Sequence, residues 1–287
     1  MHTNACRVLV SVLAGLTVVG LTGCGERAQP AATYPPVAPA PQPRVEKTET
    51  VAVEPAFDPA TVITAVRSVE PRATLGALVV DRTAGTELLA IEPDRQFRSA
   101  SLVKLLIAID VLEQKTDEHT RRQLTVMLAR SDDDIASSLW VSGGGSEIVA
   151  RTAERLGLGG TEPPKKPGRW GDVLLTAHDV ARIYEYVLTE LPDEDRELIV
   201  NALAGAPRVA KDGWDQHFGI PDGLGGTWAV KQGWSDSPTD LVIHSSGLVD
   251  EGWRYIVVLL TEHPLGTRVA AATGSVTAAA KALSPLL

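Results

Sequence analysis

Apolar residues follow two periods along the chain, and the order in which these periods occur predicts the fold class. Strand-like apolar runs predict an early hairpin and three late strands, over residues 74–83, 85–92, 227–232, 240–246 and 253–261. Helical spacing predicts helices over residues 59–69, 118–129, 133–141, 146–156, 176–191, 193–203 and 266–283. Because strands from both ends of the chain must share one sheet, we predict an α/β fold, with an antiparallel sheet flanked by helices and an all-helical subdomain. Thr176 to Asp179 predicts a capping box at the start of its helix.

The start of the chain has the pattern of an export signal. Arg7 precedes an apolar run over residues 8–21, which is shorter than the roughly 20 residues that a membrane-spanning helix needs. The sequence LTGCG follows at residues 21–25 and resembles the lipobox of bacterial lipoproteins. This resemblance implies that residues 1–23 are a lipoprotein signal peptide, and that acyl chains such as palmitate on Cys24 anchor the protein outside the cytoplasmic membrane. The alternative is an unmodified Cys24 after an ordinary signal peptide.

Composition divides the remaining chain into a linker and a domain. Residues 24–56 are dominated by Pro, Ala, Thr and Glu, which cannot bury a core, so we predict an extended lipid-anchored linker. Residues 57–287 have the length of one domain. Cys6 and Cys24 are the two cysteines of the sequence, so the domain is expected to fold without a disulfide. The formal charge is −9 without a basic stripe, which argues against nucleic acid as a partner.

Ser101 and Lys104 stand three residues apart, where a loop runs into an apolar helix. Positions i and i+3 share a helix face, so the Lys104 amine can reach the Ser101 hydroxyl and, when neutral, take its proton. The free N–H groups of a helix's first turn also favour an oxyanion. Because this spacing arises by chance in many chains, an ordinary exposed helix start without activity is the alternative.

Two further segments complete a three-part pattern. Residues 131–133, Ser-Asp-Asp, stand between two predicted helices, and residues 231–234, Lys-Gln-Gly-Trp, end a predicted strand. With Ser101 and Lys104, they resemble the SxxK, SDN and KTG motifs of the penicillin-recognising serine hydrolases, the class A β-lactamases and D-Ala-D-Ala peptidases. The resemblance covers about residues 57–287. It implies a β-lactamase/transpeptidase-like fold.

The resemblance implies a role for each matched residue. Ser101 would be the nucleophile that forms an acyl-enzyme, Lys104 its base or proton relay, and Ser131 the group that passes a proton to the leaving group. Lys231 would attract the substrate carboxylate, and the backbone N–H groups of Ser101 and Trp234 would form an oxyanion hole. The residues implied to bind substrate are Asp133, Lys231, Gln232, Gly233 and Trp234.

Three positions depart from the family pattern. Asp133 replaces an Asn, so it can only accept hydrogen bonds, and its charge would hold the Lys104 amine protonated. Gln232 replaces a Thr or Ser that contacts the substrate carboxylate, although its amide can still donate. The loop over residues 157–172 lacks the Glu-x-x-Leu-Asn that activates the deacylating water in class A enzymes, and Glu162 is a remote candidate. Efficient β-lactam hydrolysis is therefore not expected.

Each motif residue also has a purely structural interpretation. Ser131 can be a plain N-cap of the helix that follows it. Lys231 can be a solvated charge at a strand end, and Trp234 can belong to the core. The remaining tryptophans are assigned to packing.

These observations favour an extracytoplasmic, lipid-anchored serine hydrolase that acts through a Ser101 acyl-enzyme. The expected partners are a peptidoglycan stem peptide, a related amide or a β-lactam-like small molecule, and the membrane through Cys24. The alternative is a catalytically degenerate module that binds a cell-wall peptide or a protein partner. The third hypothesis is a true class A β-lactamase. No cofactor is expected, and scattered histidines without an HExxH motif make a metal site unexpected.

Overall fold

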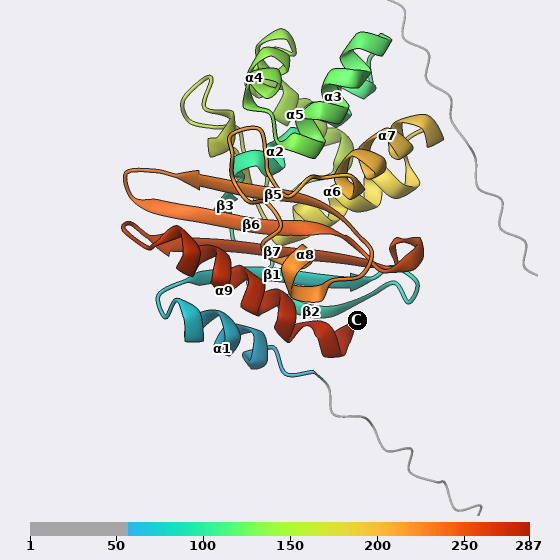
Figure 1. Cartoon of the computed structure of the whole chain (residues 1–287). Coiled ribbons are helices and arrows are strands. Elements are labelled where there is room, and N and C mark those ends of the chain that lie inside the picture. The colour runs from blue at the N-terminus through green and yellow to red at the C-terminus, as the bar shows by residue number, and fades with distance from the viewer. Residues whose placement is uncertain (1–56) are drawn as a thin grey trace, which may run out of the picture. The chain divides into compact units, whose positions relative to one another are not determined.

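The structure, a computed structural model, describes residues 57–287, so the predicted signal peptide and linker lie outside the described residues. One antiparallel sheet occupies the middle of this part of the chain, with five strands in the order β2-β1-β7-β6-β5 (Figure 1). The strands are β1 (Thr74–Asp81), β2 (Thr86–Ile91), β5 (Trp228–Asp236), β6 (Asp240–Val249) and β7 (Tyr255–Pro264). Strand β1 pairs with its hairpin partner β2 and with the late strand β7. The predicted α/β fold, in which both ends of the chain share one antiparallel sheet, is confirmed.

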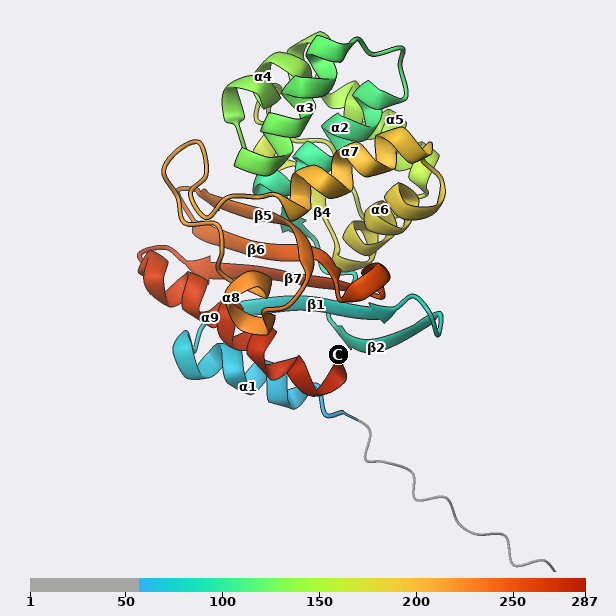
Figure 2. The same cartoon turned by 45° about the vertical axis from the view of Figure 1, so that its right-hand side comes forward.

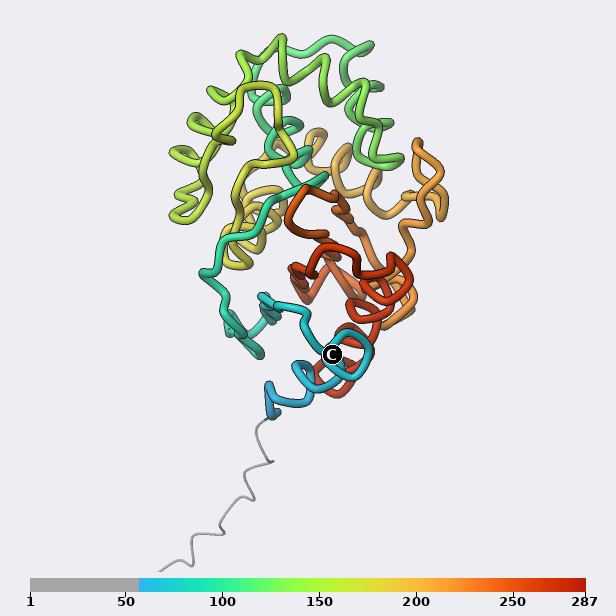
Figure 3. The backbone as a smooth tube through the Cα atoms, turned by 90° about the vertical axis from the view of Figure 1, so that its left-hand side faces the viewer, coloured from blue at the N-terminus to red at the C-terminus, as the bar shows by residue number. Residues whose placement is uncertain are grey.

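Helices from the two ends of the described chain cover one face of the sheet. Helix α1 (Ala60–Val69) lies beside α9 (Val269–Ala282), as the blue and red segments of Figure 3 show. Val62 and Val66, one turn apart on α1, are buried against the same apolar cluster as the inner face of α9. The buried positions of α9 are mostly alanine, and these small side chains let the helix lie close to the strands.

Six helices form a second layer over the other face of the sheet, toward β5 (Figure 2). They are α2 (Val103–Leu112), α3 (Glu118–Arg130), α4 (Asp133–Ser142), α5 (Ser146–Leu156), α6 (Ala177–Thr189) and α7 (Asp193–Ala204). This layer is the predicted all-helical subdomain. Within residues 57–287, no helix has the length and apolarity needed to cross a bilayer.

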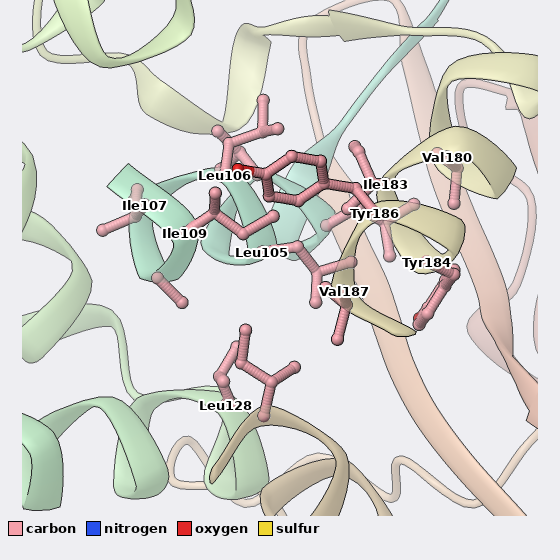
Figure 4. Close-up of a cluster of buried hydrophobic side chains, with 14 of the residues drawn as sticks. Leu105, Leu106, Ile107, Ile109, Leu128, Val180, Ile183, Tyr184, Tyr186 and Val187 are labelled. Carbon is pink, nitrogen blue, oxygen red and sulfur yellow. The ribbon is translucent and has the colours of Figure 1, made fainter. Parts of the chain in front are cut away.

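Helix α2 is the centre of the helical layer. Nine of its ten residues are buried, so the helix is enclosed on every side rather than amphipathic, and Lys104 and Asp110 are its two buried charged residues. Figure 4 shows Leu105 and Ile109 of α2 beside Val187 of α6, in the cluster that joins the two helices. Each such side chain contributes about 1.5–3 kcal/mol through burial. This core fixes the helix that carries Lys104.

A buried ion pair ties α2 to α5. Asp110 is 3% exposed, and its two carboxylate oxygens accept from Arg151 at 2.9 and 2.8 Å. We expect Asp110→Ala to lower the free energy of unfolding by about 1–3 kcal/mol, because the bidentate pair is lost and a small cavity remains. Urea unfolding followed by circular dichroism measures this loss. Glu154→Ala, an exposed position on α5, should change stability by less than about 0.5 kcal/mol. Equal effects of the two substitutions would contradict the assignment.

Several short elements escape the sequence prediction, and two of them support the nucleophile. Strands β3 (Phe97–Arg98) and β4 (Leu174–Leu175) pair with each other, and helix α8 (Ile220–Leu224) packs on α9. Two residues are too few to display a strand period. The β3–β4 pair nevertheless holds the segment that leads to Ser101. Just beyond this pair, the Ser99 N–H donates to the Val173 carbonyl at 2.7 Å.

Two local predictions are corrected by the structure. Strand β5 continues to Asp236 instead of ending at Gln232, because its pairing with β6 extends to Leu241. The capping box is only half formed: Thr176 accepts from the Asp179 N–H at 3.1 Å. The Asp179 carboxylate does not close the box but accepts from the 157–172 loop, at the Gly160 N–H and the Thr161 hydroxyl.

Candidate active site

Ser101 lies in a single 3₁₀ turn, Ala100–Leu102, that leads directly into α2. Ala100 has φ +46°, in the left-handed region that costs a non-glycine residue of order 1 kcal/mol. Strand β5 runs close beside this turn, because a side chain on Gly233 would come within 3.0 Å of the Ser99 carbonyl oxygen. Glycine at position 233 therefore allows β5 to lie close to the turn that carries Ser101.

The Lys104 amine is placed against the Ser101 hydroxyl. Their Nζ and Oγ atoms are 2.6 Å apart, and Lys104 is fully buried. The same Nζ lies 2.6 Å from Asp133 Oδ1 and 4.5 Å from the centre of the Trp170 ring. Lys104 thus contacts both the group it would activate and the carboxylate that opposes this activation.

Two opposing effects act on the charge of Lys104. Burial lowers its pKa, since the cation loses solvation in the core, and the Asp133 carboxylate raises it. The net direction is a lowered pKa. The side chain of Asp133 is 63% exposed, so water weakens its attraction for the cation. The predicted antagonism between Asp133 and the amine is therefore present in the geometry, with burial as the stronger effect.

Ser131 faces the two lysines and does not cap a helix. It ends α3 in the left-handed conformation, with φ +54° and ψ +40°, while Asp132 caps α4 by accepting from two backbone N–H groups. Its hydroxyl lies 3.0 Å from Lys231 Nζ and 3.4 Å from Lys104 Nζ. The interpretation of Ser131 as a plain N-cap is thus wrong, and the hydroxyl can relay a proton between these groups.

Lys231 is buried rather than solvated, with 1% of its surface exposed. Its amine donates to Ser131 Oγ and to the Gln232 carbonyl oxygen at 2.9 Å. Burial holds its pKa well below the usual range, and the charge of Lys104 acts in the same direction. The interpretation of Lys231 as a solvated strand-end charge is wrong for this reason.

Gln232 points away from Ser101, contrary to the expectation that its amide would donate to a substrate carboxylate. Successive side chains of a strand alternate between faces, so Gln232 lies opposite to Lys231. The amide is 1% exposed and donates to the carbonyls of Phe218 and Gln216, at 2.6 and 3.1 Å. The loop over residues 206–219 thereby binds the side chain in the interior.

Trp234, two residues further along β5, lines the edge of the cavity and is also held by this loop. Its ring stacks on Trp214, with centroids 5.4 Å apart and an interplanar angle of 8°. Its indole N–H donates to Asp212 Oδ2 at 3.0 Å. Trp234 is therefore half-buried against the core cluster that includes α9, and forms one half of a stacked aromatic pair.

A cavity of about 310 Å³ opens over the Ser101 side chain. Its lining consists of Ala100, Ser101, Asp133, residues 168–172, and Trp234, Ser235 and Asp236 of β5. Trp170 and Asp172 are not among the predicted site residues. The remaining tryptophans are assigned to packing, and the family pattern for this loop contains a glutamate rather than an aspartate. Glu162 lies outside this lining and accepts from Gln96 at 2.9 Å. Among the described residues, no three His, Cys, Asp or Glu side chains are grouped as for a metal ion.

Comparison with known proteins agrees with the fold. Residues 59–138 match the model of the Beta-lactamase enzyme family (Beta-lactamase2). A β-lactamase from Chitinophaga pinensis superposes with a TM-score of 0.64 at 14% identity, covering 79% of this chain and 98% of that one. The acyl-enzyme complex of the L158E mutant of PBP-A with penicillin G gives 0.63 at 16% identity, covering 81% and 98%.

The fold is that of the penicillin-recognising serine hydrolases, as the motif resemblance predicts. A curated relative, "Putative lipoprotein LppW" of Mycobacterium tuberculosis, is 35% identical over 224 residues, which cover 74% of this chain and 70% of LppW. The same protein of Mycobacterium bovis matches equally. The chain belongs to the LppW family.

Proposed function

We propose that this chain is a lipid-anchored serine hydrolase of the cell envelope that acts slowly through a Ser101 acyl-enzyme. The observation that carries the proposal is the 2.6 Å contact between Lys104 Nζ and Ser101 Oγ at the base of a cavity of about 310 Å³. A buried amine with a lowered pKa beside a hydroxyl has the geometry of a base and its nucleophile.

The steps follow from the positions of these groups. Neutral Lys104 takes the Ser101 proton as Oγ attacks the carbonyl carbon, and the backbone N–H groups of Ser101 and Trp234 stabilise the oxyanion. The proton then passes through the Ser131 hydroxyl to the leaving group, whose bond to the carbonyl carbon breaks. This leaves an ester on Ser101, which water hydrolyses to return the free enzyme.

Slow hydrolysis of the ester is the expected limit on turnover. Asp172 is the carboxylate that the 157–172 loop brings to the cavity, and it is engaged by Arg169 at 3.0 Å and Arg98 at 3.4 Å. Such ion pairs weaken a carboxylate as a base for water. We therefore assign peptidoglycan stem peptides or related amides as the substrate class, in preference to efficient β-lactam hydrolysis.

The test is covalent labelling of the full-length protein in detergent with an uncharged fluorescent acyl thioester and with fluorescent penicillin. We expect the thioester to leave a stable label that is absent from Ser101→Ala. Loss of the penicillin label within seconds would instead indicate a β-lactamase.

The second candidate is a degenerate module that binds a cell-wall peptide or a protein partner. The contact of 2.6 Å between Asp133 and Lys104 favours it, because an ion pair keeps the base protonated. Absence of labelling by every acyl donor, together with binding of peptidoglycan peptides, would select this candidate and reject the hydrolase.

The lipid anchor is part of the same proposal. The name of LppW describes it as a lipoprotein, and the lipobox-like LTGCG at residues 21–25 supports acylation of Cys24 in this chain. Metabolic incorporation of palmitate that persists in Cys24→Ala would contradict the assignment.

A further inference from the structure

Neither of the two side chains that the motif resemblance assigns to a substrate carboxylate is available as a donor. The Gln232 amide is bound to two backbone carbonyls on the far face of β5. The Lys231 amine is 1% exposed and already donates to Ser131 and to the Gln232 carbonyl. A carboxylate brought beside Ser101 would therefore lose its water without gaining an unengaged partner from Lys231 or Gln232.

The charges around the cavity do not compensate for this loss. Asp133 pairs with Lys104, so these two charges largely cancel. Asp172 pairs with Arg169 and with Arg98, and Arg98 also pairs with Asp240, so this group largely cancels as well. Asp236 also lines the cavity and has no ion-pair partner among residues 57–287. The charge that remains at the mouth is negative.

Asp212, which accepts hydrogen bonds from both tryptophans of the aromatic pair, is a second negative group next to the same wall. Asp212 accepts from the Trp234 indole N–H and from the Trp214 backbone N–H, both at 3.0 Å, and makes no ion pair among the described residues. The ring faces of this pair are already engaged, because Trp214 and Trp234 stack on each other and Lys231 Nζ lies 5.9 Å from the centre of the Trp234 ring. The carboxylates of Asp212 and Asp236, rather than the rings, therefore favour an ammonium group at this wall.

We propose that this site selects acyl donors with a cationic group next to the scissile carbonyl and without a free carboxylate. Asp212 and Asp236 are the residues that determine this specificity. The proposal rests on the hydrolase function above and narrows its substrate class to amides and esters that bear an amine, so that stem peptides ending in a free carboxylate would be disfavoured. This preference differs from the carboxylate recognition that the resemblance to the KTG motif implies.

Three thioesters that differ only in the end of the acyl group test the proposal: one ends in an ammonium, one in its acetylated neutral form, and one in a succinylated carboxylate form. In each case Ser101 Oγ forms the new C–O bond, the C–S bond breaks, and the thiol leaves with the Ser101 proton. Intact mass spectrometry of the full-length protein measures the rate of acylation. We expect the cationic thioester to react at least fivefold faster than the neutral one, and the anionic one to react more slowly still.

Substitutions of the two acids should reduce this preference. Asp236→Asn removes a charge without breaking a side-chain hydrogen bond of the described residues, so it is the variant least expected to disturb folding. We expect it to reduce the cationic-to-neutral rate ratio at least twofold, and Asp212→Asn to reduce it further. Glu154→Gln, an exposed position on α5, should keep the wild-type ratio. High salt should lower the ratio as well, since exposed charges are screened.

The outcomes distinguish the inference from the function on which it rests. Equal rates for the three thioesters, or fastest acylation by the carboxylate form, would overturn the charge preference while the labelled Ser101 supports the hydrolase. A preference that survives both Asp substitutions would overturn the role of these residues. Acylation by none of the three would reject the hydrolase and the inference together.

Discussion

Lys104→Met is expected to slow acylation of Ser101 by about 10²–10⁴-fold, the usual contribution of a general base. The amine lies 2.6 Å from the Ser101 hydroxyl and is the nearest group that can take its proton. Methionine fills a similar apolar volume within α2 but has no proton acceptor of comparable strength. Single-exponential labelling by the uncharged thioester gives the rate for each protein.

Folding of this variant can be checked independently. Because Lys104 is fully buried, its removal also removes a cost of desolvation, and Lys104→Met should unfold at the same temperature as the wild type or higher. A folded Lys104→Met that is labelled at the wild-type rate would show that another group activates Ser101.

Asp133→Asn is expected to accelerate acylation about tenfold at pH 7, the effect of roughly 1.4 kcal/mol on the protonation of Lys104. The carboxylate favours the cation of Lys104 and raises its pKa, so removal of this charge lets the amine lose its proton at lower pH. In the wild type, labelling should rise with pH as Lys104 becomes neutral. In Asp133→Asn, the same rise should occur at lower pH.

Asp134→Asn is the matched control for this experiment. It stands next to Asp133 in the first turn of α4, is exposed, and changes the net charge by the same amount. It should leave both the rate at pH 7 and the pH profile close to those of the wild type. Equal profiles for Asp133→Asn and the wild type would mean that the ion pair does not control the base.

The long elements of the fold could be predicted because each one displays its own period. The five strands and the helices α3 to α7 repeat apolar residues often enough to identify them from the sequence. The end of β5 could not be predicted, since Gly233 and Asp236 have little strand propensity and this end of the strand is held by pairing with β6. Strands β3 and β4 likewise form because they pair with each other, which the sequence of either segment does not indicate.

The convergence of four polar residues was predictable from the motif order, and their surroundings were not. Ser101, Lys104, Ser131 and Lys231 lie together as the family resemblance implies. The direction of Gln232 depends on carbonyl groups in the loop over residues 206–219, for which the sequence has no periodic signal. In this protein the loop holds the Gln232 amide away from Ser101, so the specificity could be argued only from the folded protein.

The central claim is that Ser101 is a nucleophile that can be acylated, and intact mass spectrometry with peptide mapping tests it most directly. The full-length protein is incubated with the uncharged thioester, and Ser101→Ala is treated in parallel. The account predicts one acyl group on the peptide that contains Ser101, held as an ester that alkaline hydroxylamine releases. An unmodified Ser101 peptide, or the same ester in Ser101→Ala, would contradict the account.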